Sequence, residues 1–428
     1  MTKNLLPRRD AADFLEGNPS VIPTKICQEA EVIVERVRAG GEPAIREYAT
    51  RFGERRPDQS LFISRDELRP QLEALAPSDR HRLERIAERI REFAVAQRDA
   101  LRSLDVTVPG GTAGHRIDPV DAAGCYAPGG RYPLPSSVLM TAITARAAGV
   151  ESVWVASPRP APITLAAAAI AKVDGVLAVG GAHAIAGLAF GVGPVPPSDV
   201  VVGPGNLYVT AAKQLLAGAV AIDMLAGPSE LLIIADESAD PAWIAADLLA
   251  QAEHDPEAVP ILIAMDPALI PAVEAELHRQ LADLPTAETA LAALGKGGVV
   301  ACPNVEEAAR VSDAIAPEHL QLCVAGASDL VPRFNHYGAI FIGERSAEVF
   351  GDYGVGPNHE LPTSGTARVR GGLSVLDFLR VRTWISLEGP DASRELIEDS
   401  AWLARQEGLE AHARAAELRW DEPGLGTI

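Results

Sequence analysis

The sequence predicts an α/β protein that contains two adjacent parallel-sheet units, and the rhythm of the chain after about residue 118 carries this prediction. Short runs of β-branched residues alternate there with alanine-rich helical segments. The runs are residues 153–156, 175–179 and 200–202, and then residues 231–235, 261–264, 299–301 and 339–342. Because alternating strands and helices build parallel sheets with helices on both faces, we expect two such units.

The two units are expected at residues 118–228 and 229–379, with the break near Gly227-Pro228-Ser229. We interpret both as incomplete Rossmann-like units. Ahead of them we expect an irregular arm over residues 1–22 and a helical region over residues 23–117 that packs with the second unit.

The helical region should open with two amphipathic helices between Cys27 and Phe52, separated by Gly40-Gly41. A longer helix is expected from Ser78, which follows a proline and suits an N-cap. After about residue 380 a helical tail is expected, and its segment 393–419 is polar with few large apolar residues. Such a tail lacks a core of its own, so we expect it to pack on a second subunit.

Composition excludes several classes of protein. The chain has 428 residues, ordinary hydrophobic content of 47% and a net charge of −20. This acidic balance argues against nucleic-acid binding, which needs a basic surface. The first ten residues lack a signal-peptide core and no apolar run reaches membrane-spanning length, so we expect a cytoplasmic protein.

The four cysteines are widely scattered and form no CxxC pair, which indicates buried thiols in a reducing compartment. Cys125 falls in a stretch rich in glycine and proline that we interpret as a loop. It is a candidate nucleophile, although no base is adjacent in the sequence.

Three glycine-rich turns stand where the strands should end, although the GxGxxG fingerprint of dinucleotide-binding proteins is absent. The turns are Tyr126-Ala127-Pro128-Gly129-Gly130, Gly180-Gly181 and Gly203-Pro204-Gly205-Asn206. Each places backbone N–H groups at a helix start, where they can meet an anionic group. Three such turns at the carboxyl ends of strands in one sheet indicate a ligand site at that edge.

Possible metal ligands are spread over the second half of the chain. Gln251 and His254 are three residues apart at the end of an expected helix, which would place both on one face. The alternative is that His254 only caps the helix or pairs with a neighbouring acid. Asp352 and His412 could complete a set suited to zinc, manganese, cobalt or nickel, with His359 as a further candidate.

Glu318 and His319 are adjacent, just after an expected helix that ends near Ile315. We expect the pair on a loop that could aim both side chains inward. A carboxylate and an imidazole suit general acid–base catalysis. A surface pair that caps the helix end is the alternative interpretation.

These motifs together resemble the histidinol dehydrogenase family. The resemblance extends in consistent order from about residue 25 to residue 419. Its motifs are Gly203-Pro204-Gly205-Asn206, Ile222-Asp223-Met224 with Ala226-Gly227-Pro228-Ser229-Glu230, Asp247 to Asp255, Ala316-Pro317-Glu318-His319-Leu320, Gly351-Asp352-Tyr353 with Gly356-Pro357-Asn358-His359, and Gly408-Leu409 with Ala411-His412.

The resemblance implies two NAD-dependent oxidations of L-histidinol, through L-histidinaldehyde to L-histidine, the last step of histidine biosynthesis. It implies one zinc per subunit in the second α/β unit, and four zinc ligands that also belong to the substrate site: Gln251, His254, Asp352 and His412. His319 would be the general base, and Glu318 would activate water. Ser229, His319 and Glu407 would contact the substrate.

The first α/β unit would be the NAD side, with contacts from Tyr126 and Asn206. The family usually has glutamine in the Gly-Gly-Ala-Gln turn, whereas this chain has His183 there. Histidine keeps one hydrogen bond but titrates, so NAD affinity or its pH dependence is expected to differ. The resemblance also implies a homodimer whose tails reach the neighbouring site, so that Glu407 and His412 would act in trans.

Two alternatives remain at this point. Relatives on the same scaffold oxidise other small alcohols, including sulfonated diols, and a degenerate copy could be a non-catalytic, metal-binding regulatory subunit. The chain keeps the residues beside the substrate and the whole proposed ligand set, which favours histidinol oxidation.

Overall fold

The computed structural model describes residues 4–14, 22–129, 132–388 and 393–419. They form two compact units. The main unit contains the described residues up to Ala96 together with Val120–Phe378, and the tail unit contains Gln97–Pro119 and the described residues from Leu379 onward. The mixed α/β class with parallel sheets is confirmed.

The first sheet of the main unit has six strands in the order β1-β6-β5-β4-β7-β8. Their bounds are Phe62–Ser64 (β1), Gly175–Leu177 (β6), Ser152–Ala156 (β5), Ala122–Tyr126 (β4), Val200–Val202 (β7) and Ala221–Ile222 (β8). All neighbours pair in parallel except β1 with β6. The chain passes from β4 outward through β5 to β6 and then returns to place β7 on the other side of β4. Ligands of open parallel sheets bind outside the carboxyl ends at such a switch point.

Helices cover both faces of the first sheet. One face packs on α1 (Thr24–Arg51), α6 (Gly181–Phe190) and α7 (Leu207–Leu216) in a single core. The other face holds α4 (Pro135–Ala148), where Cys125 of β4 meets Thr141, and α4 packs in turn on α5 (Pro162–Ile170). Next to α5 lies α2 (Arg65–Glu73).

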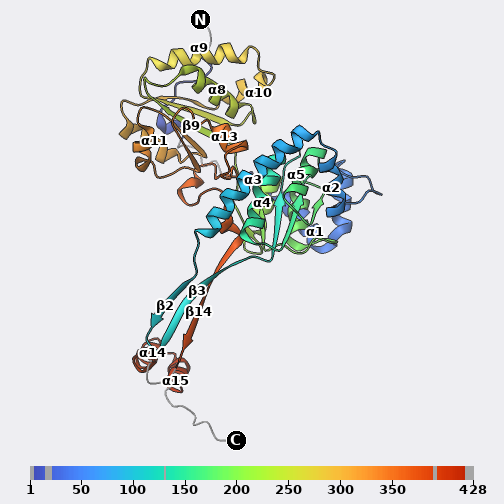
Figure 1. Ribbon diagram of the computed structural model, residues 1–428, viewed down its shortest axis with the longest axis vertical. Coiled ribbons are helices and arrows are strands. Elements are labelled where there is room, and N and C mark those ends of the chain that lie inside the picture. Colours follow the sequence, from blue (N-terminus) through green and yellow to red (C-terminus); the bar gives the residue numbers. More distant parts are fainter. Residues whose placement is uncertain (1–3, 15–21, 130–131, 389–392, 420–428) are drawn as a thin grey trace. The chain divides into compact units, whose positions relative to one another are not determined.

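The second sheet has five parallel strands in the order β11-β10-β9-β12-β13. Their bounds are Gly298–Ala301 (β11), Val259–Ala264 (β10), Glu230–Ala235 (β9), His319–Cys323 (β12) and Ala339–Ile342 (β13). One face packs on α8 (Pro241–Ala252), α9 (Leu269–Leu281) and α10 (Ala287–Leu294). The other face packs on α11 (Val305–Ile315), α12 (Ala327–Leu330) and the short η2 (Val331–Arg333), as Figure 1 shows for α11. Its switch point lies between β9 and β12.

The remaining elements of the main unit are short apart from one helix. They are η1 (Ala11–Phe14), α3 (Pro77–Asp99, which crosses into the tail unit), α13 (Glu348–Tyr353), η3 (Thr366–Arg368) and η4 (Val375–Phe378). The described part of the expected arm is tied to the second α/β unit, because the backbone N–H groups of Leu5 and Leu6 donate to Glu274 of α9. Residues 1–3 and 15–21 of the arm lie outside the described residues.

The tail unit contains an antiparallel sheet in the order β14-β3-β2, which Figure 1 shows as a long ribbon that ends at α14 and α15. The strands are Leu104–Val108 (β2), Gly111–Pro119 (β3) and Leu379–Leu387 (β14), and the helices are Arg394–Gln406 (α14) and Glu410–Glu417 (α15). The helices expected in the tail over 380–428 are present as α14 and α15, but the described part of the tail opens with the strand β14, which was not expected. Residues 389–392 and 420–428 of it lie outside the described residues.

Two expectations about the opening third need correction. The region 23–117 is not wholly helical, because it contains β1, β2 and β3. Nor do α1 and α2 pack with the second α/β unit: Val34 and Ile45 of α1 share a core with Ile185 of α6. The break in α1 is confirmed, since Gly41 has φ 56° and interrupts the helical conformation. Contact with the second unit comes from α3, where Arg89 donates to the carbonyl of Gly354 at 2.9 Å.

Three site segments expected as loops are regular structure. Cys125 lies in β4, a central strand of small residues, and small residues carry little strand propensity. His319 is the first residue of β12, and Asp352 lies in α13. Conversely, His254 lies just beyond α8, which ends at Ala252.

Among the described residues, no helix is both long and apolar enough to cross a membrane.

Candidate active site

A cleft of about 400 Å³ joins the two sheets within the main unit. Its first wall comes from the turns after β4 and β7, at the carboxyl edge of the first sheet. Its second wall comes from the amino edge of the second sheet: the starts of β9 and β12, the end of α8, and α13. The carboxyl ends of one sheet therefore face the amino ends of the other.

The acid–base pair lies at the start of β12, where it is braced against β9. The backbone N–H of Glu230 donates to Glu318 Oε2 at 2.8 Å, and the backbone N–H of Glu318 donates back to Glu230 Oε2 at 3.3 Å. His319 Nδ1 lies 2.9 Å from the backbone carbonyl of Glu230. A carbonyl only accepts, so Nδ1 carries the proton and Nε2 keeps a lone pair that can accept another.

Burial sets the charge of this pair. His319 is 4% exposed, and burial lowers its pKa to about 4. Burial likewise raises the pKa of Glu318 well above its usual range and that of Glu230 to about 7. His319 is thus a neutral base at neutral pH. The Glu318 carboxylate, when ionised, is a stronger base than an exposed glutamate.

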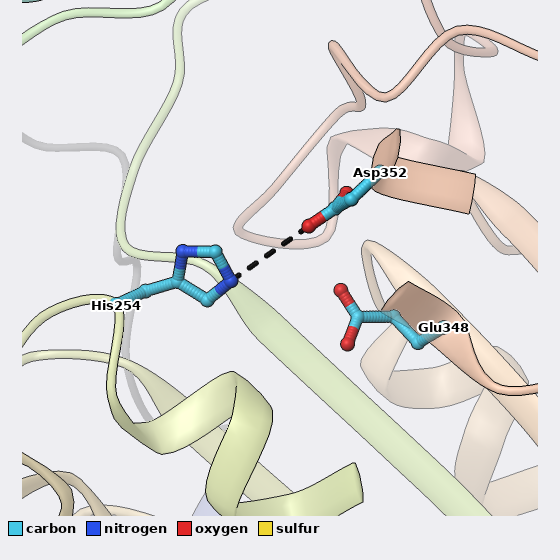
Figure 2. Close-up of side chains that lie close together, drawn as sticks. All are labelled: His254, Glu348 and Asp352. Atoms are coloured by element: carbon cyan, nitrogen blue, oxygen red, sulfur yellow. Dashed lines mark ion pairs between the residues drawn. The ribbon is translucent and has the colours of Figure 1, made fainter. Parts of the chain in front are cut away.

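Side chains that can bind a metal ion lie next to this pair, on the same wall of the cleft. One ligand atom from each of His254, Glu348 and Asp352 lies within 4.8 Å of the others, and Figure 2 shows the three side chains converging. His254 Nε2 lies 3.8 Å from Asp352 Oδ2. Gln251 lines the same cleft and is fully buried, and neither of its amide atoms has a hydrogen-bond partner among the described residues. An unpartnered buried amide costs free energy, which a ligand in the cleft would recover.

His359, whose role the sequence left open, braces Asp352. Its Nδ1 lies 3.1 Å from the backbone carbonyl of Asp352, and its Nε2 lies 3.4 Å from Glu360 Oε1. Although burial acts against it, hydrogen bonds with both carboxylates raise the pKa of His359 to about 10. The cationic imidazole in turn holds the pKa of Asp352 below its usual range, against the opposing effect of burial.

Sequence reasoning missed Glu348, which is 2% exposed. Its Oε1 is buried, has no hydrogen-bond partner in the part of the chain that the structure describes, and lies 3.7 Å from His319 Nε2. Burial and the charge of Asp352 raise its pKa to about 8. The signal was present in the spacing, since Glu348 and Asp352 are four apart and share a helix face. The glycines and prolines that follow had hidden this helix.

A second pocket, of about 770 Å³, lies at the carboxyl edge of the first sheet. Tyr126, His183 and Asn206, the three expected NAD contacts, all line it. His183 Nε2 lies 3.0 Å from Glu54 Oε2, and its ring packs on Tyr48 with 5.7 Å between the centroids. Asn206 also lines the cleft, so the two spaces adjoin.

Three turn glycines, Gly180, Gly181 and Gly203, do not have N–H groups free to meet an anion as expected. Those of Gly180 and Gly181 donate to Glu54 and to the Tyr126 hydroxyl. At the third turn, Gly203 donates to Asp223, and the Asn206 side chain caps α7. The chain's own side chains therefore satisfy these amides, a tertiary arrangement that local sequence does not reveal. Gly130 of the remaining turn lies outside the described residues.

The other expected site residues divide between the units. Ser229 lines the cleft beside Glu318. Glu407 and His412 belong to the tail unit, after α14 and within α15, so their place beside the other ligands stays a prediction.

The fold and this cleft together are typical of an enzyme that combines an acid–base pair with metal-binding side chains. The family model for histidinol dehydrogenase matches residues 18–420. Histidinol dehydrogenase of Thermus thermophilus is 46% identical over 90% of this chain and 93% of its own length. That of Methylococcus capsulatus is 45% identical over 92% of each chain.

The crystal structure of histidinol dehydrogenase from Elizabethkingia anophelis superposes with a TM-score of 0.89 at 28% identity, and covers 98% of this chain and 99% of its own. The chain belongs to the histidinol dehydrogenase family, and it is a dehydrogenase.

Proposed function

We propose that this protein catalyses the zinc-dependent, NAD-linked, four-electron oxidation of L-histidinol to L-histidine through L-histidinaldehyde, as the last step of histidine biosynthesis. The observation that carries the proposal is the neutral His319 at the amino edge of the second sheet, on the same wall of the cleft as the cluster that contains His254 and Asp352. Membership of the family supports the substrate.

The residues present fit a zinc ion. Gln251 has an orphaned buried amide, and His254 and Asp352 supply nitrogen and oxygen donors within 4.8 Å. These three side chains would hold the ion, with His412 of a neighbouring subunit as the fourth ligand. When bound, zinc supplies Lewis-acid polarisation and orientation of the substrate's nitrogens. The family's tail exchange requires a homodimer, which we propose here for a soluble, cytoplasmic protein.

The chain's own side chains can carry the proton chemistry. His319 Nε2 is free to accept the substrate hydroxyl proton, because Nδ1 is committed to the Glu230 carbonyl. Glu318 is fixed by Glu230 beside it, and its carboxylate would activate water for addition to the aldehyde. Ser229 and Glu407 would contact the substrate. Tyr126, His183 and Asn206 line the adjoining pocket and would hold NAD, which when bound would supply a hydride acceptor for each oxidation.

The test is to incubate zinc-loaded protein with NAD⁺ and L-histidinol and to measure NADH and histidine. Two NADH for each histidine formed is the expected result. Turnover only with another small alcohol, such as a sulfonated diol, would support the related-dehydrogenase alternative. Zinc binding without turnover of any alcohol would indicate a regulatory metal-binding subunit.

A further inference from the structure

The pocket of about 770 Å³ on the first sheet contains charges that the reaction as described does not use. Its charged lining consists of Glu29, Arg51, Glu54 and Arg159, in addition to the buried His183. A volume of this size suits a small organic cofactor. The distribution of these charges indicates where the negative part of such a cofactor lies.

The usual phosphate-binding position of a parallel sheet is filled by the chain itself. In many nucleotide-binding proteins the pyrophosphate meets free N–H groups at a helix start. Here the N–H of Gly180, at the start of α6, donates to Glu54 Oε2 at 3.2 Å, and that of Gly181 donates to the Tyr126 hydroxyl at 3.1 Å. A carboxylate in that position also repels phosphate. A dianionic group must therefore bind elsewhere in the pocket.

Both acids of the pocket have partners. Glu54 is held by His183 and Gly180, and Glu29 accepts a hydrogen bond from the Tyr208 hydroxyl. The two arginines differ, since neither has a carboxylate or carbonyl partner among the described residues. Arg51 lies over the Phe52 ring at 5.8 Å, and Arg159 is exposed.

Arg159 also has an unusual backbone. It lies between Pro158 and Pro160 just after β5, and its φ of 44° is in the left-handed region that L-residues rarely adopt. Such a conformation costs on the order of 1 kcal/mol and persists where the surroundings fix it. In a chain with a net charge of −20, two unpaired guanidinium groups on one pocket are well placed to bind an anion. Guanidinium matches phosphate oxygens in bidentate geometry.

We propose that Arg51 and Arg159 bind the pyrophosphate of the dinucleotide, while the end of the pocket at Glu54 and His183 takes its uncharged groups. This inference rests on the proposed use of NAD. The side chains of Arg51 and Arg159, instead of N–H groups at a helix N-terminus, would then provide the affinity for the negatively charged pyrophosphate.

The experiment compares Arg159→Gln and Arg51→Gln with Arg56→Gln in zinc-loaded, full-length protein. Arg56 is a matched control, because it is exposed, forms an ion pair with Asp58 at 3.7 Å, and does not line the pocket. Binding of ADP and of adenosine is measured by calorimetry, and the Michaelis constant for NAD⁺ by NADH formation. We expect each pocket variant to weaken ADP binding and raise the Michaelis constant by about 10-fold or more, with kcat changing far less. Adenosine binding should be unchanged, as should all constants of Arg56→Gln.

Two results would overturn the inference. Equal weakening of ADP and adenosine would mean that the arginines contact the base or ribose, and unchanged ADP binding would mean that they contact nothing. Failure of the proposed function would give a different result. ADP binding would still be weakened in the two arginine variants, but the wild-type protein would form no NADH. Wild-type protein that binds neither NAD⁺ nor ADP would refute both.

Discussion

The two parallel sheets of the main unit meet the cleft with opposite edges, and this difference separates their roles. The first sheet presents the carboxyl ends of its strands and hence the starts of its helices, such as α6 and α7. The second presents the amino ends of its strands and the last turn of α8, which holds Gln251. Helix starts favour anions and helix ends favour cations. The second edge thus suits a metal ion and an amine substrate, whereas at the first edge the chain occupies the start of α6 and the proposed affinity for an anionic dinucleotide comes from Arg51 and Arg159.

The edges also differ in how their polar groups are satisfied. At the first edge the turn amides of Gly180, Gly181 and Gly203 all have partners in the chain. Among the described residues, Gln251 and Glu348 at the second edge have buried side-chain atoms without partners, as do Ser157 and His183 at the first edge. Unpartnered buried groups are expensive to maintain, and those of the second edge line the same cleft as Glu318 and His319, so we place the chemistry at that edge. Substitutions at the second edge should accordingly cost most.

The largest effect is expected from His319→Asn. The asparagine amide can still donate to the Glu230 carbonyl, as His319 Nδ1 does at 2.9 Å, but it offers no base in place of Nε2. We expect kcat to fall by about 10²- to 10⁴-fold while zinc content stays near that of the wild type. Steady-state kinetics and metal analysis check this. A kcat within about tenfold of the wild type would remove His319 from its role as the base.

A large loss is also expected from His254→Ala, this time in metal affinity. His254 is one of the three side chains whose ligand atoms converge, and its removal leaves the set incomplete. Affinity for zinc should fall by more than the roughly 100-fold that loss of a supporting residue costs. Chelator competition measures this, with thermal unfolding to confirm that the fold persists. His278→Ala, on the exposed side of α9, is the matched control and should keep its zinc. Equal zinc affinity in both variants would contradict the ligand assignment.

A smaller effect is expected at the first edge from His183→Gln. Glutamine can keep a hydrogen bond to Glu54, which His183 Nε2 now makes at 3.0 Å, while losing the ring packed on Tyr48. We predict a Michaelis constant for NAD⁺ that is about 2- to 5-fold lower, since an amide can bond to Glu54 and still offer a second donor and a carbonyl acceptor to the cofactor. The measurement is NADH formation across NAD⁺ concentrations. Unchanged kinetics would show that this position does not tune cofactor binding.

The local sequence pattern predicted the strands that are rich in β-branched residues. It did not predict the elements and contacts that depend on tertiary packing. Strands rich in β-branched residues, such as 153–156 and 231–235, were predicted close to their observed bounds. The strand Ala122–Tyr126 was missed because burial on both faces, and not propensity, makes it a strand. Glu348 was missed for a related reason, since its contact with His319 joins α13 to β12. The capped glycine turns likewise depend on Glu54, which is more than a hundred residues away in the chain.

The smallest effect is expected from Cys125→Ala, which tests whether the first edge holds any reacting group. Cys125 is fully buried in β4, and burial raises its pKa to about 12, so almost no thiolate exists at neutral pH. A thiol in this state neither attacks a substrate nor reacts quickly with alkylating agents. We expect kcat to change by less than about twofold and the native protein to resist iodoacetamide at this position, whereas the partly exposed Cys27 reacts. Mass spectrometry of labelled peptides locates the reaction. Loss of activity on selective modification of Cys125 would place a nucleophile at the first edge and erase the division of roles between the two sheets.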